Sequence, residues 1–140
     1  MRDRIDAMSE LADIVFDCAH PASQARFWAA ALDGYAVAPY DDEELARLRA
    51  NGITDPEDDP GVLVLPPSPD KPRLFFQKVP EAKIAKNRVH LDLRPADRTA
   101  EVARLVALGA SVRAEIEHET GQRWTTMADP EGNEFCVLEP

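Results

Sequence analysis

The residues around position 90 are the best suited to acid–base chemistry. His90 lies between Arg88 and Asp92 in the segment RVHLDL, two residues from each. An imidazole titrates near neutral pH, so it can serve as a general base or as a hydrogen-bond donor to a ligand. His90 could equally be an interior histidine whose hydrogen bonds only stabilise the fold. The sequence leaves both interpretations open.

Cys136 is the second group with potential chemistry. It and Cys18 are the two cysteines of the chain, and their spacing is not that of a zinc ribbon. A thiol facing a ligand cavity can act as a nucleophile or a soft metal ligand, whereas a lone buried cysteine is usually an inert apolar residue. We expect two free thiols and an inert Cys136. His20 and His118 fall in loop sequence and receive no function.

Strands must place these residues on a common face. Residues 13–18 and 88–93 have strand composition, and side chains alternate between the two faces of a strand. The apolar faces must pack against helices, so the charged faces should form the opposite surface of the sheet. Alternation assigns to that surface Asp13 and Asp17 from the first strand, and Arg88, His90 and Asp92 from the second.

The chain repeats one strand–helix–strand pattern. Pro21 opens a helix with Phe27 and Trp28 on its apolar face, and a second helix opens after Pro95 and carries Val102 and its neighbours at helical spacing. A shift of 75 positions superimposes the two units. It sets Asp17 on Asp92, Gly34 on Gly109 and Val37 on Val112. Units of equal length predict a duplicated half-domain.

Further strands are predicted in each half, at residues 62–65 and 74–78 and at residues 124–127 and 134–138. Residues 41–53 (DDEELARLRANGI) break the symmetry and predict a short inserted helix. We therefore predict one domain over residues 1–140. Module 1 spans about 11–80, with the insert at about 41–53, and module 2 spans about 87–140.

Composition limits the classes of partner. Hydrophobic residues make up 44% and charged residues 30% of the 140 residues, which is typical of a globular protein. A net charge of -10 disfavours nucleic acids and anionic membranes. The sequence has no apolar run of membrane-spanning length and no signal-peptide core, so we expect a cytoplasmic protein. It also lacks phosphate-loop, GxSxG and HExxH motifs.

Three segments together resemble one known family. WTTMADPEGNEFCVLEP, KNRVHLDL with the following helix that ends in LGA, and FDCAHP with the downstream FW pair are similar to the glyoxalase-like branch of the vicinal oxygen chelate superfamily, which includes glyoxalases, bleomycin resistance proteins and dioxygenases. The resemblance covers nearly the whole chain from Leu11. It implies an α+β fold of two tandem βαβββ modules that form a curved, cup-shaped mixed sheet with helices on the convex side.

The DPEGN motif of this resemblance predicts a tight turn. Asp129 and Pro130 are typical of turn initiation, and Gly132 can adopt the positive φ that lets the chain reverse between two strands. We therefore assign the motif, including Glu131, a structural role before any catalytic one.

The resemblance also implies where a metal would bind. In metal-dependent members the ligands come from the opening and closing strands of the halves. The aligned positions here are Asp13, Arg88, Cys136, and Phe76 or, if the register slips by one, Gln77. Arginine is not a metal ligand, so we expect no metal and no other cofactor. Because the repeat makes Asp13 and Arg88 equivalent, we predict a salt bridge between them.

Three functions follow from this interpretation. The first is metal-independent binding of a small organic molecule in the concave pocket, with His90 as the candidate catalytic group. The second is a metal-dependent lyase or dioxygenase, whose ligands could include Asp13, His90 and Glu134 if one strand is misaligned by two residues. The third is a dimeric, non-catalytic binding or resistance module, and the resemblance implies a homodimer. The expected binding residues are Asp13, Asp17, Phe76, Gln77, Arg88, His90, Asp92, Trp124, Glu134 and Cys136.

Overall fold

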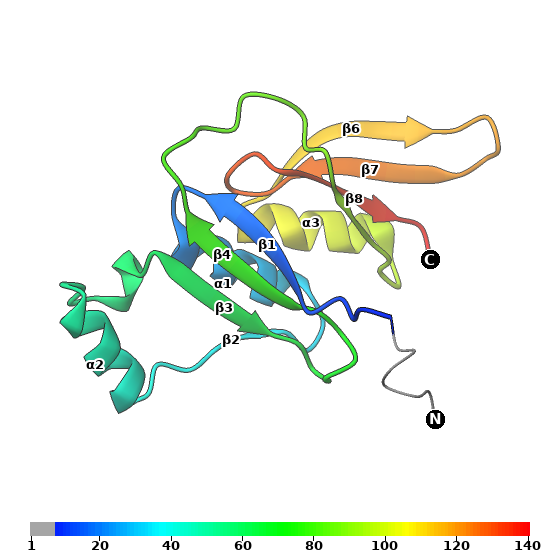
Figure 1. Ribbon diagram of the computed structural model, residues 1–140. Coiled ribbons are helices and arrows are strands. Elements are labelled where there is room, and N and C mark those ends of the chain that lie inside the picture. Colours follow the sequence, from blue (N-terminus) through cyan, green and yellow to red (C-terminus); the bar gives the residue numbers. More distant parts are fainter. Residues whose placement is uncertain (1–7) are drawn as a thin grey trace.

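The computed structural model describes residues 8–140 and confirms the predicted α+β architecture (Figure 1). The first half contains β1 (Asp13–Cys18), α1 (Pro21–Ala31), β2 (Ala36–Val37), α2 (Asp42–Ala50), the 3-10 helix η1 (Pro56–Asp58), β3 (Gly61–Leu65) and β4 (Arg73–Lys78). The second half contains β5 (Leu91–Leu93), α3 (Arg98–Leu108), β6 (Ser111–Glu117), β7 (Arg123–Ala128) and β8 (Glu134–Leu138). No helix within residues 8–140 has the length and apolarity needed to cross a bilayer.

The strands form two four-stranded mixed sheets of identical topology. The order is β1-β4-β3-β2 in the first sheet and β5-β8-β7-β6 in the second. In each sheet the opening strand runs parallel to the closing strand, and the other pairs are antiparallel. Two different sequences therefore produce the same strand order, as expected for a duplicated unit.

One apolar core joins the two sheets, and α1 lies at its centre. Trp28 contacts Phe16 of the first sheet, with ring centroids 5.5 Å apart, and Phe135 of the second, at 5.1 Å. Leu105 of α3 belongs to the same buried cluster. Because each sheet turns its apolar face toward the helices, its opposite face remains free to bind other molecules.

The two helices reveal an error of two residues in the predicted repeat. Both helices have 11 residues, and their N-cap residues, His20 and Asp97, lie 77 positions apart rather than 75. The predicted shift matched Gly34 with Gly109. Gly109 is the C-cap of α3, whereas Gly34 lies two residues beyond Leu32, the C-cap of α1. The connection after α1 is therefore longer.

The offset of two residues is confined to the helices. β1 and β5 end 75 positions apart, at Cys18 and Leu93, and β2 and β6 begin 75 positions apart, at Ala36 and Ser111, so the strands keep the predicted shift. The predicted strand over residues 88–93 is also too long, because β5 begins at Leu91. Val89, expected on the buried face, is 76% exposed. Arg88, the position equivalent to Asp13 under that shift, thus lies in irregular chain rather than in a strand.

Candidate functional site

A cavity of about 1090 Å³ lies on the helix-free face of the second sheet. Its base includes Asp92 of β5, Cys136 of β8 and Thr126 of β7, which are successive register partners across the sheet. Five of the predicted site residues line it together: His90, Asp92, Trp124, Glu134 and Cys136. Arg88, which alternation assigned to the same face, is not among the lining residues.

His90, Asp92 and Cys136 form a compact donor cluster in this cavity. The His90 Nε2 atom lies 3.2 Å from Asp92 Oδ1. One donor atom from each of the three side chains lies within 4.8 Å of the other two. The His90 and Asp92 side chains are 43% and 50% exposed, so a ligand can reach them. An imidazole held by a carboxylate can accept or donate a proton.

The Cys136 thiol is protonated under ordinary conditions. Burial raises its pKa, and a contact of 3.7 Å between its Sγ and Thr126 Oγ1 only partly opposes that shift. A neutral thiol is a poor nucleophile. The structure therefore favours the predicted inert role, unless a metal ion displaces the proton.

Glu134 holds the segment that leads into His90. Its carboxylate accepts hydrogen bonds from Lys83 Nζ at 2.9 Å and from the Asn87 backbone N–H at 2.9 Å. Partial burial alone would raise the pKa of Glu134, but these hydrogen bonds lower it to about 2. Both oxygens are occupied, so Glu134 positions the chain before β5 rather than offering a free base.

The predicted residues of the first half lie outside this cavity. Asp13 is bonded to Arg73, its register partner on β4, at 2.7 and 3.0 Å. The predicted Asp13–Arg88 salt bridge is therefore wrong, because Arg73 is directly opposite in the parallel pair. On the same face, Gln77 Nε2 donates to Asp17 Oδ1 at 2.7 Å. The first sheet thus pairs its polar side chains with one another.

Phe76 is a core residue rather than a binding residue. It is fully buried and stacks on Phe16, with ring centroids 4.9 Å apart. Its neighbour Gln77 is exposed and lies on the polar face of β4. The alternative prediction, in which the register slips by one residue, therefore names the residue that faces outward. An aromatic side chain on a half-buried strand gives no local sign of which face it occupies.

Sequence reasoning missed several residues that line the cavity. Lys86 comes from the connection before β5, Arg94 from the residue after β5, and Thr126 and Leu138 from β7 and β8. Alternation could have found Thr126 and Leu138, since they share a face with Trp124 and Cys136. It could not have found Lys86, because that residue lies in irregular chain.

The lining of the cavity removes the argument against a metal. His90 lines it and Arg88 is not among its lining residues. An imidazole nitrogen, a carboxylate oxygen and a thiolate sulfur are all accepted by Zn²⁺, and catalytic zinc sites often have three protein ligands and one open position. The donor set of His90, Asp92 and Cys136 therefore fits a divalent transition metal.

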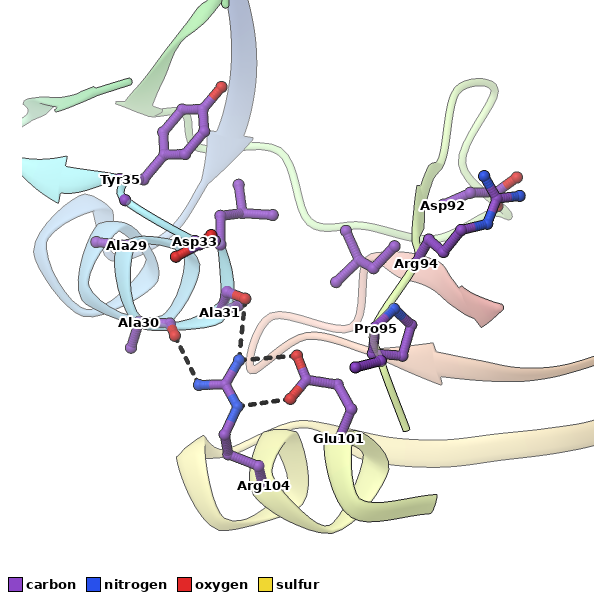
Figure 2. A pocket seen from close by; sticks show the side chains of 14 residues that line it. Ala29, Ala30, Ala31, Asp33, Tyr35, Asp92, Arg94, Pro95, Glu101 and Arg104 are labelled. Atoms are coloured by element: carbon purple, nitrogen blue, oxygen red, sulfur yellow. Dashed lines mark hydrogen bonds and ion pairs between the residues drawn. The ribbon is translucent and has the colours of Figure 1, made fainter. Parts of the chain in front are cut away.

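A second cavity, of about 720 Å³, lies where the two halves meet (Figure 2). There Arg104 of α3 donates to the backbone carbonyls of Ala30 at 2.8 Å and Ala31 at 3.0 Å, at the end of α1, and its guanidinium also pairs with Glu101. Arginine thus satisfies carbonyls that the helix leaves unpaired. These contacts join the two modules.

The DPEGN turn has the predicted structural role. Gly132 adopts φ 87°. Asp129 is 3% exposed and accepts hydrogen bonds from Trp28 Nε1 at 3.0 Å and from the Gln24 side chain, both on α1. Glu131 accepts the Ala19 and His20 backbone N–H groups, at 2.6 and 2.8 Å. The turn therefore fastens the second sheet to the start of α1.

Several solved structures share this fold. A glyoxalase/bleomycin resistance protein/dioxygenase family enzyme from Burkholderia phytofirmans PsJN has 14% identity and a TM-score of 0.62, covering 94% of this chain and 98% of that one. A hypothetical protein from S. aureus has 13% identity and a TM-score of 0.63, covering 96% and 95%. A bleomycin-binding protein complexed with bleomycin has 13% identity and a TM-score of 0.54, covering 95% and 99%.

A search of curated proteins found no significant match. The model of one family, described as a glyoxalase-like domain, matches residues 13–138. That span runs from the first residue of β1 to the last residue of β8 and includes both modules. This protein therefore belongs to the family of glyoxalase-like domains.

Proposed function

We propose that this protein binds a small organic molecule in the cavity over the second sheet. The observation that carries the proposal is the convergence of His90, Asp92 and Cys136 at the base of a hollow of about 1090 Å³ that also contains Trp124 and Leu138. Small-molecule sites typically combine apolar walls with a few converging polar groups. The similar fold of a bleomycin-binding protein supports the same class of ligand.

A thermal-shift screen against small organic anions, cations and aromatic compounds tests this proposal. A ligand at about 100 times its dissociation constant should stabilise the protein by about 2.7 kcal/mol. The Trp124→Ala variant should lose the shift. Phe75→Ala, which removes a half-buried aromatic ring from the first sheet, is the matched control and should keep it. If no compound of a broad panel stabilises the protein, the proposal fails.

His90 is the residue we propose for any proton transfer on the ligand. Its contact with Asp92 holds the ring, and its exposure leaves it accessible. If the ligand is converted, His90→Gln should abolish turnover while leaving binding largely intact. Loss of binding and turnover together would assign His90 to binding alone.

A metal-dependent lyase or dioxygenase is the second candidate, and the spacing of the three donors within 4.8 Å favours it. A metal bound by His90, Asp92 and Cys136 would polarise a ligand oxygen. Metal content should be measured after purification without chelators. A stoichiometric transition metal that disappears in both His90→Ala and Cys136→Ser would establish this candidate and replace metal-independent binding.

A cytoplasmic homodimer remains our proposal for assembly and location. The opening strands β1 and β5 lie at the edges of their sheets. Exposed apolar side chains lie beside them, namely Leu11 and Val15 near β1 and Ile84 and Val89 before β5. Exposed edges and apolar side chains favour association. Light scattering coupled to size exclusion should give twice the monomer mass. If ligand screening is also silent, a non-catalytic dimeric module becomes the better description.

A further inference from the structure

We infer that the cavity over the second sheet selects a small organic anion, and that Lys86 and Arg94 hold its negative charge. This inference rests on the proposed function and specifies its ligand class. It runs against the charge of the whole chain, which is -10 and would by itself disfavour anions. Local charge decides instead, because it acts over a few ångströms and is screened beyond about 8–10 Å.

Three charged side chains around the cavity already have a charged partner. Glu134 pairs with Lys83 at 2.9 Å, and Glu139 lies 3.3 Å from Arg98, which also pairs with Glu115 at 2.8 Å. Arg123, the third, pairs with Glu117 at 3.2 Å. These three groups therefore contribute little free charge to a ligand.

Lys86 and Arg94 differ from them. Among residues 8–140 neither side chain forms an ion pair or a hydrogen bond, although both line the cavity. Asp92 carries the opposing charge and is in contact with His90. Lys86 and Arg94 thus supply two unpaired positive charges to the cavity, against the one negative charge of Asp92.

Both cations border the cavity. Lys86 lines it together with Cys136 of its base. Arg94 follows Asp92 by two residues, and Figure 2 shows its side chain extending to the side on which Asp92 projects. Lysine and arginine from the two sides of β5 therefore border one hollow, where a carboxylate can accept charge-assisted hydrogen bonds.

Trp124 adds a preference for a flat ligand. It lines the same cavity, and its ring is stacked with His118, with centroids 6.3 Å apart and planes inclined by 29°. The stacking keeps the indole as a flat apolar wall, against which aromatic groups pack well. An aromatic or conjugated carboxylate combines both features.

Three probes with the same ring separate charge from shape. Benzoate, benzamide and benzamidine are negative, neutral and positive, and their affinities can be measured by titration followed in the NMR signals of His90 and Trp124. We expect benzoate to bind at least about tenfold more tightly than benzamide, and benzamidine to bind most weakly, because charge-assisted hydrogen bonds are the stronger ones. Added salt should weaken benzoate alone.

Two double variants test whether Lys86 and Arg94 cause the preference for benzoate. Lys86→Ala with Arg94→Ala should reduce the affinity for benzoate to that for benzamide and leave benzamide unchanged. Lys71→Ala with Arg113→Ala removes the same charge from exposed sites outside the cavity and should change benzoate binding less than about twofold.

The outcomes also separate this inference from the proposed function. Equal binding of benzoate and benzamide, tighter binding of benzamidine, or equal loss in both double variants would overturn anion selection, yet signal changes at Trp124 would still support a ligand cavity. No binding of benzoate would also overturn the inference. The proposed function fails only if no compound in the thermal-shift screen stabilises the protein.

Discussion

Asp129 and Asp92 are two carboxylates of the second module with opposite surroundings. Asp129 is 3% exposed and accepts hydrogen bonds from the side chains of Gln24 and Trp28, from the backbone of Glu131, and from both the backbone and side chain of Asn133. The Asp92 side chain is 50% exposed and contacts His90. A carboxylate whose lone pairs are all used stabilises the fold, whereas one with free lone pairs can serve a ligand. The number of hydrogen bonds that a carboxylate accepts thus distinguishes a structural role from a binding role, whereas the residue type, aspartate in both cases, does not.

Removing the Asp129 carboxylate, whose lone pairs are all used, should have the largest effect on stability. Asp129→Ala leaves the buried donors of Gln24 and Trp28 without an acceptor, and it frees the turn from α1. We expect a loss of about 3–5 kcal/mol in the free energy of unfolding, measured by urea denaturation. A loss below about 1 kcal/mol would show that the turn does not depend on Asp129.

Glu134 is intermediate between Asp129 and Asp92 in the hydrogen bonds that it accepts. Its contribution to the free energy of unfolding should depend on pH. Its folded pKa of about 2 is below the ordinary value of 4.5, so the folded state binds this proton less readily than the unfolded state. The stabilisation is present above about pH 5 and is lost as the pH falls toward 2. We expect about 2 kcal/mol at neutral pH, since partial exposure reduces the full linkage value.

Urea denaturation of the wild type and of Glu134→Gln between pH 7 and 2 measures this contribution. The two curves should converge as the pH falls. Glu119→Gln, a change in an exposed loop, should run parallel to the wild type throughout. Parallel curves for Glu134→Gln would show that its hydrogen bonds do not contribute to stability.

The Asp13–Arg73 ion pair of the first sheet should have a smaller effect on stability. The hydrogen bond from Arg73 lowers the pKa of Asp13, but both side chains are exposed enough for solvent to weaken the pair. A double-mutant cycle of Asp13→Asn with Arg73→Gln should show a small coupling that salt reduces. The corresponding cycle with Arg88→Gln should show none. Coupling to Arg88 instead would support the salt bridge first expected between Asp13 and Arg88.

Asp92→Ala should have the smallest effect on stability, within about 0.5 kcal/mol, because it removes an exposed group with free lone pairs. Its consequence should instead be a changed ligand affinity, measured by titration against whichever compound the thermal screen identifies. A large loss of stability with unchanged binding would reverse the comparison with Asp129.

Local sequence was sufficient for the elements but not for their alignment. Strand 13–18, the helix that opens at Pro21 and the DPEGN turn were all predicted from neighbouring residues. The alignment of the two helices failed by two residues because it relied on Gly34 and Gly109, which follow their helices at different distances. A glycine marks the need for positive φ but not its place relative to a helix end.

The sequence by itself determined that this is a duplicated α+β protein and that His90 and Asp92 share the polar face of the second half, because alternation and helix punctuation depend only on near neighbours. Only the tertiary structure decided that Arg73 neutralises Asp13, that Phe76 joins the core, and that Lys86 and Arg94 border the cavity. Those outcomes depend on pairing between distant strands and on the path of irregular chain, for which no local periodicity exists.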